Sequence, residues 1–181
     1  MADFRAPSAS LNVEKIRSSW YPSTVNGKIK RIDELQAIVK QAKTGDKKVV
    51  LTNGCFDLIH PGHLYLLGES RKLGDLLVVA VNSDRSVKAL KGPHRPILPE
   101  AQRAELIAAL EMVDYVILFD EPDPYGIVEK LRPDVLVKGG DWPKEKIVGR
   151  DLVEQDGGTV AVIPYLEGHS TTKIIERMQR N

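Results

Sequence analysis

Residues 49–63, which read VVLTNGCFDLIHPGH, decide the fold that this chain is expected to adopt. The apolar, β-branched run at residues 48–52 predicts a short buried strand. Pro61 suits the first turn of a helix, because the N–H group that proline lacks has no partner there in any case. Gly54 and Gly62 let the backbone approach a ligand closely. A strand that turns directly into a helix predicts a βα unit with a ligand site in its turn.

The rest of the chain alternates between the same two kinds of segment. Short apolar runs predict four more strands, at residues 76–81, 115–119, 135–138 and 159–163. Helical patterns fall at residues 31–43, 61–73, 99–110, 124–131, about 149–155 and 171–179. Strands that alternate with helices predict right-handed crossovers and a parallel sheet covered on both faces. The expected fold class is therefore α/β: a Rossmann-like, doubly wound, five-stranded parallel sheet in a three-layer α/β/α sandwich.

Length and composition bound the organisation of the chain. Its 181 residues suffice for one catalytic domain, expected at residues 29–181, after an N-terminal arm at residues 1–28 that shows no clear period. With 26 Lys and Arg against 25 Asp and Glu, the chain has no basic field to capture nucleic acid. It lacks both a signal-peptide stretch and the run of about 18 apolar residues of a membrane span. We expect a cytoplasmic protein without nucleic-acid or membrane partners.

Two histidines mark the start of the helix that follows the first predicted strand. His60 and His63 are three residues apart, so both imidazoles can face one point, where the helix terminus favours an anion. Imidazoles there can donate hydrogen bonds to phosphate oxygens and offset charge in a transition state. The alternatives are a helix cap, a zinc site or a cysteine nucleophile. Zinc would have only Cys55 and Asp57 nearby, and Cys55 has no assignable partners for nucleophilic catalysis.

The segment after the second predicted strand is expected to be a polar loop. Residues 82–96 carry four basic side chains and His94, which either are solvated or clamp phosphorylated ligands. Lys91 is the first candidate for a phosphate contact and Lys88 the second. In the helix that follows, Arg103 is either a solvated charge or another phosphate clamp.

Two further turns belong to the candidate site. Gly139 permits close backbone approach after the fourth strand, and Asp141 either accepts hydrogen bonds from a nucleotide or belongs to a plain turn. Ser170, Thr171 and Thr172 precede the last helix, where one hydroxyl would suffice as an N-cap. Three hydroxyls beside free N–H groups predict a second anion site.

These motifs resemble those of the HxGH nucleotidyltransferase superfamily, which is also called cytidylyltransferase-like. The segment NGCFDLIHPGH at residues 53–63 resembles its signature, and STT before KII resembles the segment that holds the β- and γ-phosphates. The resemblance implies that His60 and His63 are catalytic and contact a triphosphate. The nucleotide site that we infer also includes Asn53, Gly54, Cys55, Phe56, Asp57, Gly62, Gly139, Asp141, Ser170, Thr171 and Thr172.

Within the superfamily, residues 81–92 (VNSDRSVKALKG) and 137–142 (VKGGDW) resemble the heptose-phosphate adenylyltransferases. These enzymes transfer AMP from ATP to D-glycero-β-D-manno-heptose 1-phosphate, giving ADP-heptose for lipopolysaccharide and releasing pyrophosphate. The similarity implies that Lys91 is a third catalytic residue, in contact with phosphate. The acceptor-binding candidates are Asp57, Lys88, Arg103 and Lys138.

Cofactor and partners follow from the same resemblance. Mg²⁺ is expected to be carried by the nucleotide, with no protein ligand assigned to it. We expect a homodimer or larger homo-oligomer and a separate heptose kinase that supplies the sugar 1-phosphate. One alternative is glycerol-3-phosphate cytidylyltransferase, whose RTEG signature has an arginine where this chain has Tyr165. Another is a binding module that senses a nucleotide, although both histidines are retained. The sequence does not determine the base.

Overall fold

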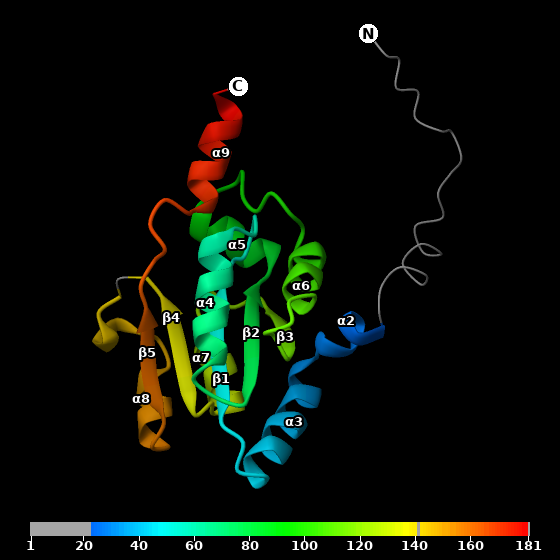
Figure 1. Ribbon diagram of the computed structural model, residues 1–181, viewed down its shortest axis with the longest axis vertical. Helices are drawn as coiled ribbons and strands as arrows, with labels where there is room; N and C mark the ends of the chain where they lie inside the picture. Colours follow the sequence, from blue (N-terminus) through cyan, green and yellow to red (C-terminus); the bar gives the residue numbers. More distant parts are fainter. Residues whose placement is uncertain (1–22, 141, 181) are drawn as a thin grey trace.

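The computed structural model describes residues 23–140 and 142–180, which form one sheet with helices on both of its faces (Figure 1). Five parallel strands lie in the order β3-β2-β1-β4-β5. This confirms the predicted fold class. After β3 the chain returns across the sheet and places β4 beside β1, so the winding direction reverses between these two strands. The strands are β1 (Val49–Gly54), β2 (Leu76–Asn82), β3 (Tyr115–Phe119), β4 (Val135–Gly139) and β5 (Thr159–Ile163).

Two hydrophobic cores hold the helices against the sheet. Successive strand residues point to opposite faces, so that Val49 and Leu51 belong to one core and Val50 to the other. The first face is covered by α3 (Ile32–Thr44), α7 (Tyr125–Leu131) and α8 (Arg150–Gln155). The second is covered by α2 (Ser23–Lys28), α4 (Pro61–Arg71) and α6 (Glu100–Ala108). None of the described helices is long and apolar enough to cross a membrane.

Residues 82–96 do not form a continuous loop, which corrects the prediction. Asp84–Lys91 form the helix α5, and the hydroxyl oxygen of Ser83 caps it by accepting a hydrogen bond from the backbone N–H of Ser86 at 3.1 Å. Val87 is fully buried beneath the helix. Half of the α5 residues are charged, so the segment reads as polar, although Val87 and Leu90 have the spacing of one helix face.

The last residues of the expected arm are helical. Residues 23–28 form α2, where Val25 is buried in the same core as α6. The Lys28 ammonium donates a hydrogen bond to the backbone oxygen of Leu110 at 3.1 Å. The rest of the arm, with Trp20 and Tyr21, lies outside the described residues.

Two further elements are a short 3-10 helix at Lys144–Lys146, between β4 and α8, and the helix α9 (Thr171–Gln179), after β5. In Figure 1, α9 projects beyond the carboxyl ends of the strands. None of its residues is buried. The final helix therefore adds little to the two cores and leaves its side chains available at the top of the sheet.

Candidate active site

A cavity of about 780 Å³ opens at the carboxyl ends of the strands. Its position coincides with the reversal between β1 and β4, where doubly wound sheets bind ligands. Every strand contributes, because each one ends at this edge. The contributing segments are residues 53–57 at and after the end of β1, residue 82 at the end of β2, residues 122–124 after β3, residues 138–139 at the end of β4 and residues 163–166 at and after the end of β5.

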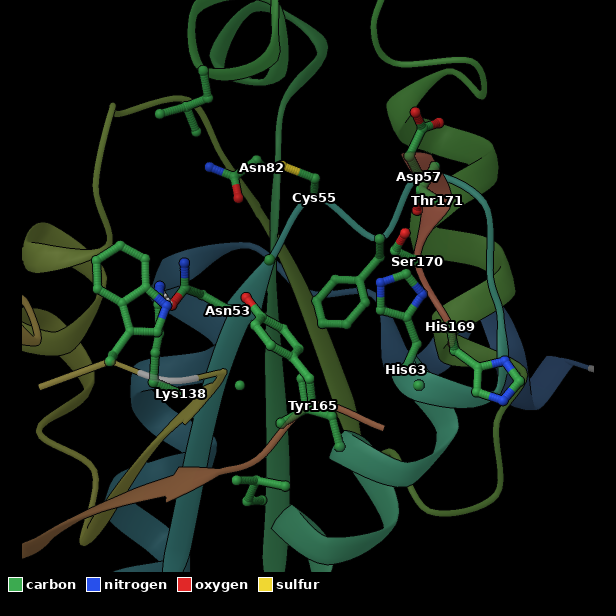
Figure 2. Close-up of a pocket in the computed structure, with 18 of the residues that line it drawn as sticks. Asn53, Cys55, Asp57, His63, Asn82, Lys138, Tyr165, His169, Ser170 and Thr171 are labelled. Carbon is green, nitrogen blue, oxygen red and sulfur yellow. Dashed lines mark hydrogen bonds between the residues drawn. The ribbon is translucent and has the colours of Figure 1, made fainter. Parts of the chain in front are cut away.

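The starts of α4 and α9 both face this cavity. The lining from α4 and the residue before it includes His60, Gly62 and His63, while the turn into α9 contributes Ser170, Thr171 and Thr172. The two turns also touch, since the Thr171 hydroxyl donates a weak hydrogen bond, 3.5 Å long, to the backbone oxygen of Leu58. Figure 2 shows His63, Ser170 and Thr171 around one part of the pocket. Two segments 113 residues apart in sequence thus meet at one site.

The two imidazoles form a stacked pair. Their ring centroids are 3.8 Å apart with 22° between the ring planes, and Phe56 packs against His63 at 5.2 Å. Gly62 makes room for the pair, because a Cβ at this position would lie 3.0 Å from the His60 ring. The Nδ1 atoms of both rings are buried without a hydrogen-bond partner among the described residues. Buried polar atoms of this kind are suited to a ligand that supplies the missing partner.

Both histidines are neutral near neutral pH. Burial lowers the pKa of His63 to about 4, and the neighbouring His60 adds to this effect. Burial also lowers the pKa of His60, with the charge of His169 as a second cause. A neutral imidazole keeps one N–H donor, which can approach phosphate oxygens without carrying a buried charge beforehand. The pair can therefore bind a phosphate through hydrogen bonds without carrying a positive charge beforehand.

We expect a triphosphate to draw protons onto this pair. Phosphate beside an imidazole favours the charged form and raises the pKa of His63 above its free value of about 4. Between the free and bound pKa values the complex holds more protons than the free protein, so triphosphate affinity rises as the pH falls toward 4. Calorimetric titration with a magnesium complex of α,β-methylene-ATP, in buffers of different ionisation enthalpy, measures this uptake. The control is His63→Asn, and equal uptake by both proteins would contradict the prediction.

Two lysines bring positive charge to the other side of the pocket. Lys91 from the end of α5 and Lys138 from β4 both line it. The Lys138 ammonium donates a hydrogen bond to the side-chain oxygen of Asn53 at 3.2 Å (Figure 2). It also lies 5.7 Å from the ring centre of Trp142. Burial lowers the pKa of Lys138, and the nearby charge of Lys91 lowers it further. A second anionic group in the cavity would offset this repulsion between like charges.

Asp57 holds a neighbouring loop in place. Its side chain is 1% exposed and lines the cavity, yet both carboxylate oxygens are engaged. One oxygen accepts a hydrogen bond from Arg95 Nε at 2.6 Å, and the other accepts from the backbone N–H groups of Ile97 and Leu98 at 2.8 and 3.0 Å. This contact places Arg95 on the cavity wall. The predicted contact of Asp57 with nucleotide or acceptor stays a prediction.

Arg103, an acceptor-binding candidate, lies away from the cavity. It is fully buried on α6, and its guanidinium donates hydrogen bonds to the backbone oxygens of Leu98 and Cys55 and to the Asp84 carboxylate. Its donors are committed to the protein, so Arg103 is neither the solvated charge nor the phosphate clamp that the sequence suggested. The structure corrects this prediction: Arg103 joins the turn after β1 to the starts of α5 and α6.

Lys88, another acceptor-binding candidate, is exposed on α5 and is not among the cavity residues, and its predicted contact with the acceptor stays a prediction. It lies one turn before Lys91 on this helix, and the end of α5, with Leu90 and Lys91, is the part that reaches the cavity. The sequence suggested both lysines because residues 82–96 were expected to be a polar loop and resemble a segment whose lysines contact phosphate. A helix holds them in fixed directions instead.

Several cavity residues escaped the sequence-based reasoning, although each lies at or beyond the end of a strand. Tyr165 follows β5 and rests on Gly140, whose φ of +116° suits glycine and where a Cβ would lie 2.6 Å from the tyrosine ring. Gly139 lines the cavity as predicted, whereas Asp141 lies outside the described residues. The only signal in the sequence for the missed side chains was their position at or beyond the carboxyl end of a predicted strand. They are Asn82, Asp123, Trp142 and Tyr165.

The described residues hold no group of three or more His, Cys, Asp or Glu side chains arranged to bind a metal ion. Within the cavity, Asp57 has both oxygens occupied, and burial raises the pKa of the Cys55 thiol so that it is neutral near neutral pH. The residues beside the histidines therefore suit an anion more than a bare cation. The Mg²⁺ expected with the nucleotide stays a prediction.

Comparison with known proteins gives consistent matches. A family model described as cytidylyltransferase-like matches residues 51–177. The bifunctional protein HldE of Geotalea uraniireducens is 52% identical over 154 residues, covering 85% of this chain and 31% of that protein. The HldE of Syntrophotalea carbinolica is 46% identical over 172 residues, covering 94% and 35%. The chain thus spans about a third of the length of these curated relatives.

Solved structures show the same fold. The lipopolysaccharide core biosynthesis protein from Thermoplasma volcanium is 34% identical with a TM-score of 0.56, covering 68% of this chain and 99% of that one. Pantoate-β-alanine ligase from Francisella tularensis, described as complexed with β-γ ATP and β-alanine, has a TM-score of 0.54 at 14% identity, covering 83% of this chain and 76% of that one. At that identity the second match concerns the fold alone.

Proposed function

Since this chain belongs to the cytidylyltransferase-like family and is a nucleotidyltransferase, we propose that it transfers AMP from ATP to D-glycero-β-D-manno-heptose 1-phosphate. The products would be ADP-heptose and pyrophosphate. The observation that carries this proposal is the shared cavity of the stacked histidine pair and the hydroxyl-bearing start of α9. Each turn suits one part of a polyphosphate, and together they suit a triphosphate held along its length.

The choice of acceptor has separate support. Residues 81–92 and 137–142 resemble the heptose-phosphate adenylyltransferases, and these segments contribute Asn82, Lys91 and Lys138 to the cavity. The matched relatives are named HldE, and one similar structure is named for lipopolysaccharide core biosynthesis. A polar side chain and two lysines in one pocket suit a ligand that carries both hydroxyl groups and a phosphate.

The proposed reaction needs no general base. An oxygen of the acceptor phosphate, already anionic near neutral pH, attacks the α-phosphorus in line, while the bond from that phosphorus to the bridging oxygen breaks. The neutral imidazoles of His60 and His63 donate N–H groups to phosphate oxygens as negative charge gathers on them. Lys91 and Lys138 hold the attacking phosphate. Bound Mg²⁺ would neutralise charge on the triphosphate, and Mg²⁺ dependence is part of this proposal.

A matrix of four nucleoside triphosphates against several acceptors, read by pyrophosphate release, tests the assignment. We expect ATP with heptose 1-phosphate to give the highest kcat/KM, ahead of glycerol 3-phosphate and hexose 1-phosphates. Success of CTP with glycerol 3-phosphate would overturn the acceptor and base while leaving the reaction class intact. The tyrosine at position 165, in place of the arginine of RTEG, counts against that result.

Two parts of the proposal need other measurements. Tight nucleotide binding without pyrophosphate from any pair would instead indicate a sensor. Light scattering coupled to size-exclusion chromatography tests the expected homo-oligomer. The proposed location is the cytoplasm, and a kinase that makes heptose 1-phosphate would supply the acceptor.

A further inference from the structure

A second pocket, of about 600 Å³, adjoins the active-site cavity. The two share a wall, because the same five residues line both: His60, Gly168, His169, Ser170 and Lys173. Beyond this wall the second pocket continues along α9, where Arg177 and Arg180 line it and do not line the cavity. We call this space the α9 pocket. It begins where the cavity is expected to hold phosphate.

Positive charge follows one face of α9. Lys173, Arg177 and Arg180 are spaced four and three residues apart, so they lie in one row about 10 Å long. All three are exposed, and no carboxylate lies within ion-pair distance of them among the described residues. The other exposed arginines among the described residues are paired, Arg31 with Asp33 and Arg85 with Asp120. One acidic side chain, Glu176, also lines the α9 pocket.

We propose that the α9 pocket binds inorganic pyrophosphate as it leaves the active site. This inference rests on the proposed function. When the acceptor oxygen bonds to the α-phosphorus, the bond to the bridging oxygen breaks and its electron pair leaves with the pyrophosphate, so no proton need move. The released anion lies beside Ser170, at the head of the row of cations. Arginine side chains are suited to phosphate because each can donate two parallel hydrogen bonds.

A diphosphate can come from two sources here, the β- and γ-phosphates of bound ATP or the free product. The geometry separates them. Lys173 lines both spaces, so it can serve either ligand, whereas Arg177 and Arg180 line only the α9 pocket. A triphosphate whose α-phosphorus lies at the histidine pair would not need these two arginines. Free pyrophosphate, no longer bonded to the α-phosphorus, can move from Lys173 along α9 to Arg177 and Arg180.

Calorimetric titration tests the inference with two probes, magnesium pyrophosphate and magnesium α,β-methylene-ATP, on the full chain. In the double variant Arg177→Gln/Arg180→Gln we expect pyrophosphate affinity to fall about fivefold to tenfold, as the loss of two exposed charges allows. The analogue's affinity should change less than about twofold. The difference should shrink near about 0.5 M potassium chloride, because salt screens exposed charges. The matched control is Lys40→Gln/Lys130→Gln, two exposed cations in the groove between α3 and α7.

The possible outcomes are distinct. Unchanged pyrophosphate affinity would overturn the inference, and so would an equal loss for both probes, which would assign the arginines to the bound triphosphate. A change in oligomeric state without a change in pyrophosphate affinity would assign the row to a subunit contact instead, and would also overturn it. The titration needs neither acceptor nor turnover. If the chain failed to transfer AMP to heptose 1-phosphate, the titration would therefore still show whether the α9 pocket binds pyrophosphate.

Discussion

The substitution His63→Ala is expected to lower kcat for nucleotidyl transfer about a thousandfold, with a much smaller change in the KM for the triphosphate. His63 stacks on His60 and faces the cavity with a neutral ring, because burial keeps its pKa near 4. Its N–H group gains most when negative charge moves onto the transferring phosphate, so the loss falls on the transition state. Steady-state rates of pyrophosphate release measure the effect.

His94 provides a matched control, since it is exposed and is not among the cavity residues. We expect His94→Ala to retain the wild-type rate within about twofold, as surface substitutions usually do. His63→Gln should recover part of the lost activity, because its amide can still donate a hydrogen bond. The double variant of His60 and His63 should lose little more than either single variant, since paired groups act as a unit. Equal rates for His63→Ala and His94→Ala would show that the histidine pair is not catalytic.

Most of the fold could be predicted because the strands of a parallel sheet covered on both faces appear directly as apolar runs in the sequence. Its strands carry buried apolar residues on both faces of the sheet, so each one reads as a short apolar run bounded by polar residues. The predicted strands at residues 115–119 and 159–163 match β3 and β5, and the other three differ by one or two residues at their ends. The paired histidines were also visible, because their spacing at a helix start is local.

The contacts that could not be predicted are those between distant segments. Arg103 looks like an ordinary polar residue on an amphipathic helix, and its partner Cys55 lies 48 residues away. Asp57 looks like a member of the nucleotide site, yet the residues that occupy its carboxylate follow about 40 positions later. In both cases a charged side chain is buried because tertiary partners satisfy it, and a local pattern does not record such partners.

Arg103 therefore yields the second large prediction. Arg103→Met is expected to lower the free energy of unfolding by about 3–5 kcal/mol, the range for breaking a buried ion pair from one side. Methionine fills much of the volume but donates no hydrogen bond. The backbone oxygens of Cys55 and Leu98 would lose their donor, and the Asp84 carboxylate would lose its cation. Urea unfolding followed by circular dichroism measures the change.

An exposed ion pair serves as the comparison. Arg85 pairs with Asp120, but its side chain is 82% exposed, so Arg85→Gln should cost no more than about 1 kcal/mol. Arg103→Lys retains the charge and should still cost about 2 kcal/mol, because one ammonium cannot reach three partners that a planar guanidinium joins. Similar losses in Arg85→Gln and Arg103→Met would mean that the buried network contributes nothing beyond a surface pair.

Coupling to Asp84 identifies which part of the loss is electrostatic. Adding Asp84→Asn to Arg103→Met removes the unpaired carboxylate, so the double variant should be more stable than the sum of the single effects by about 1–2 kcal/mol. The lost donors to Cys55 and Leu98 would remain. Because Cys55 lines the cavity, the double variant should still bind a triphosphate more weakly than the wild type. Recovered stability with weakened nucleotide binding would separate the two roles of this arginine, one in folding and one in holding the turn that carries the site.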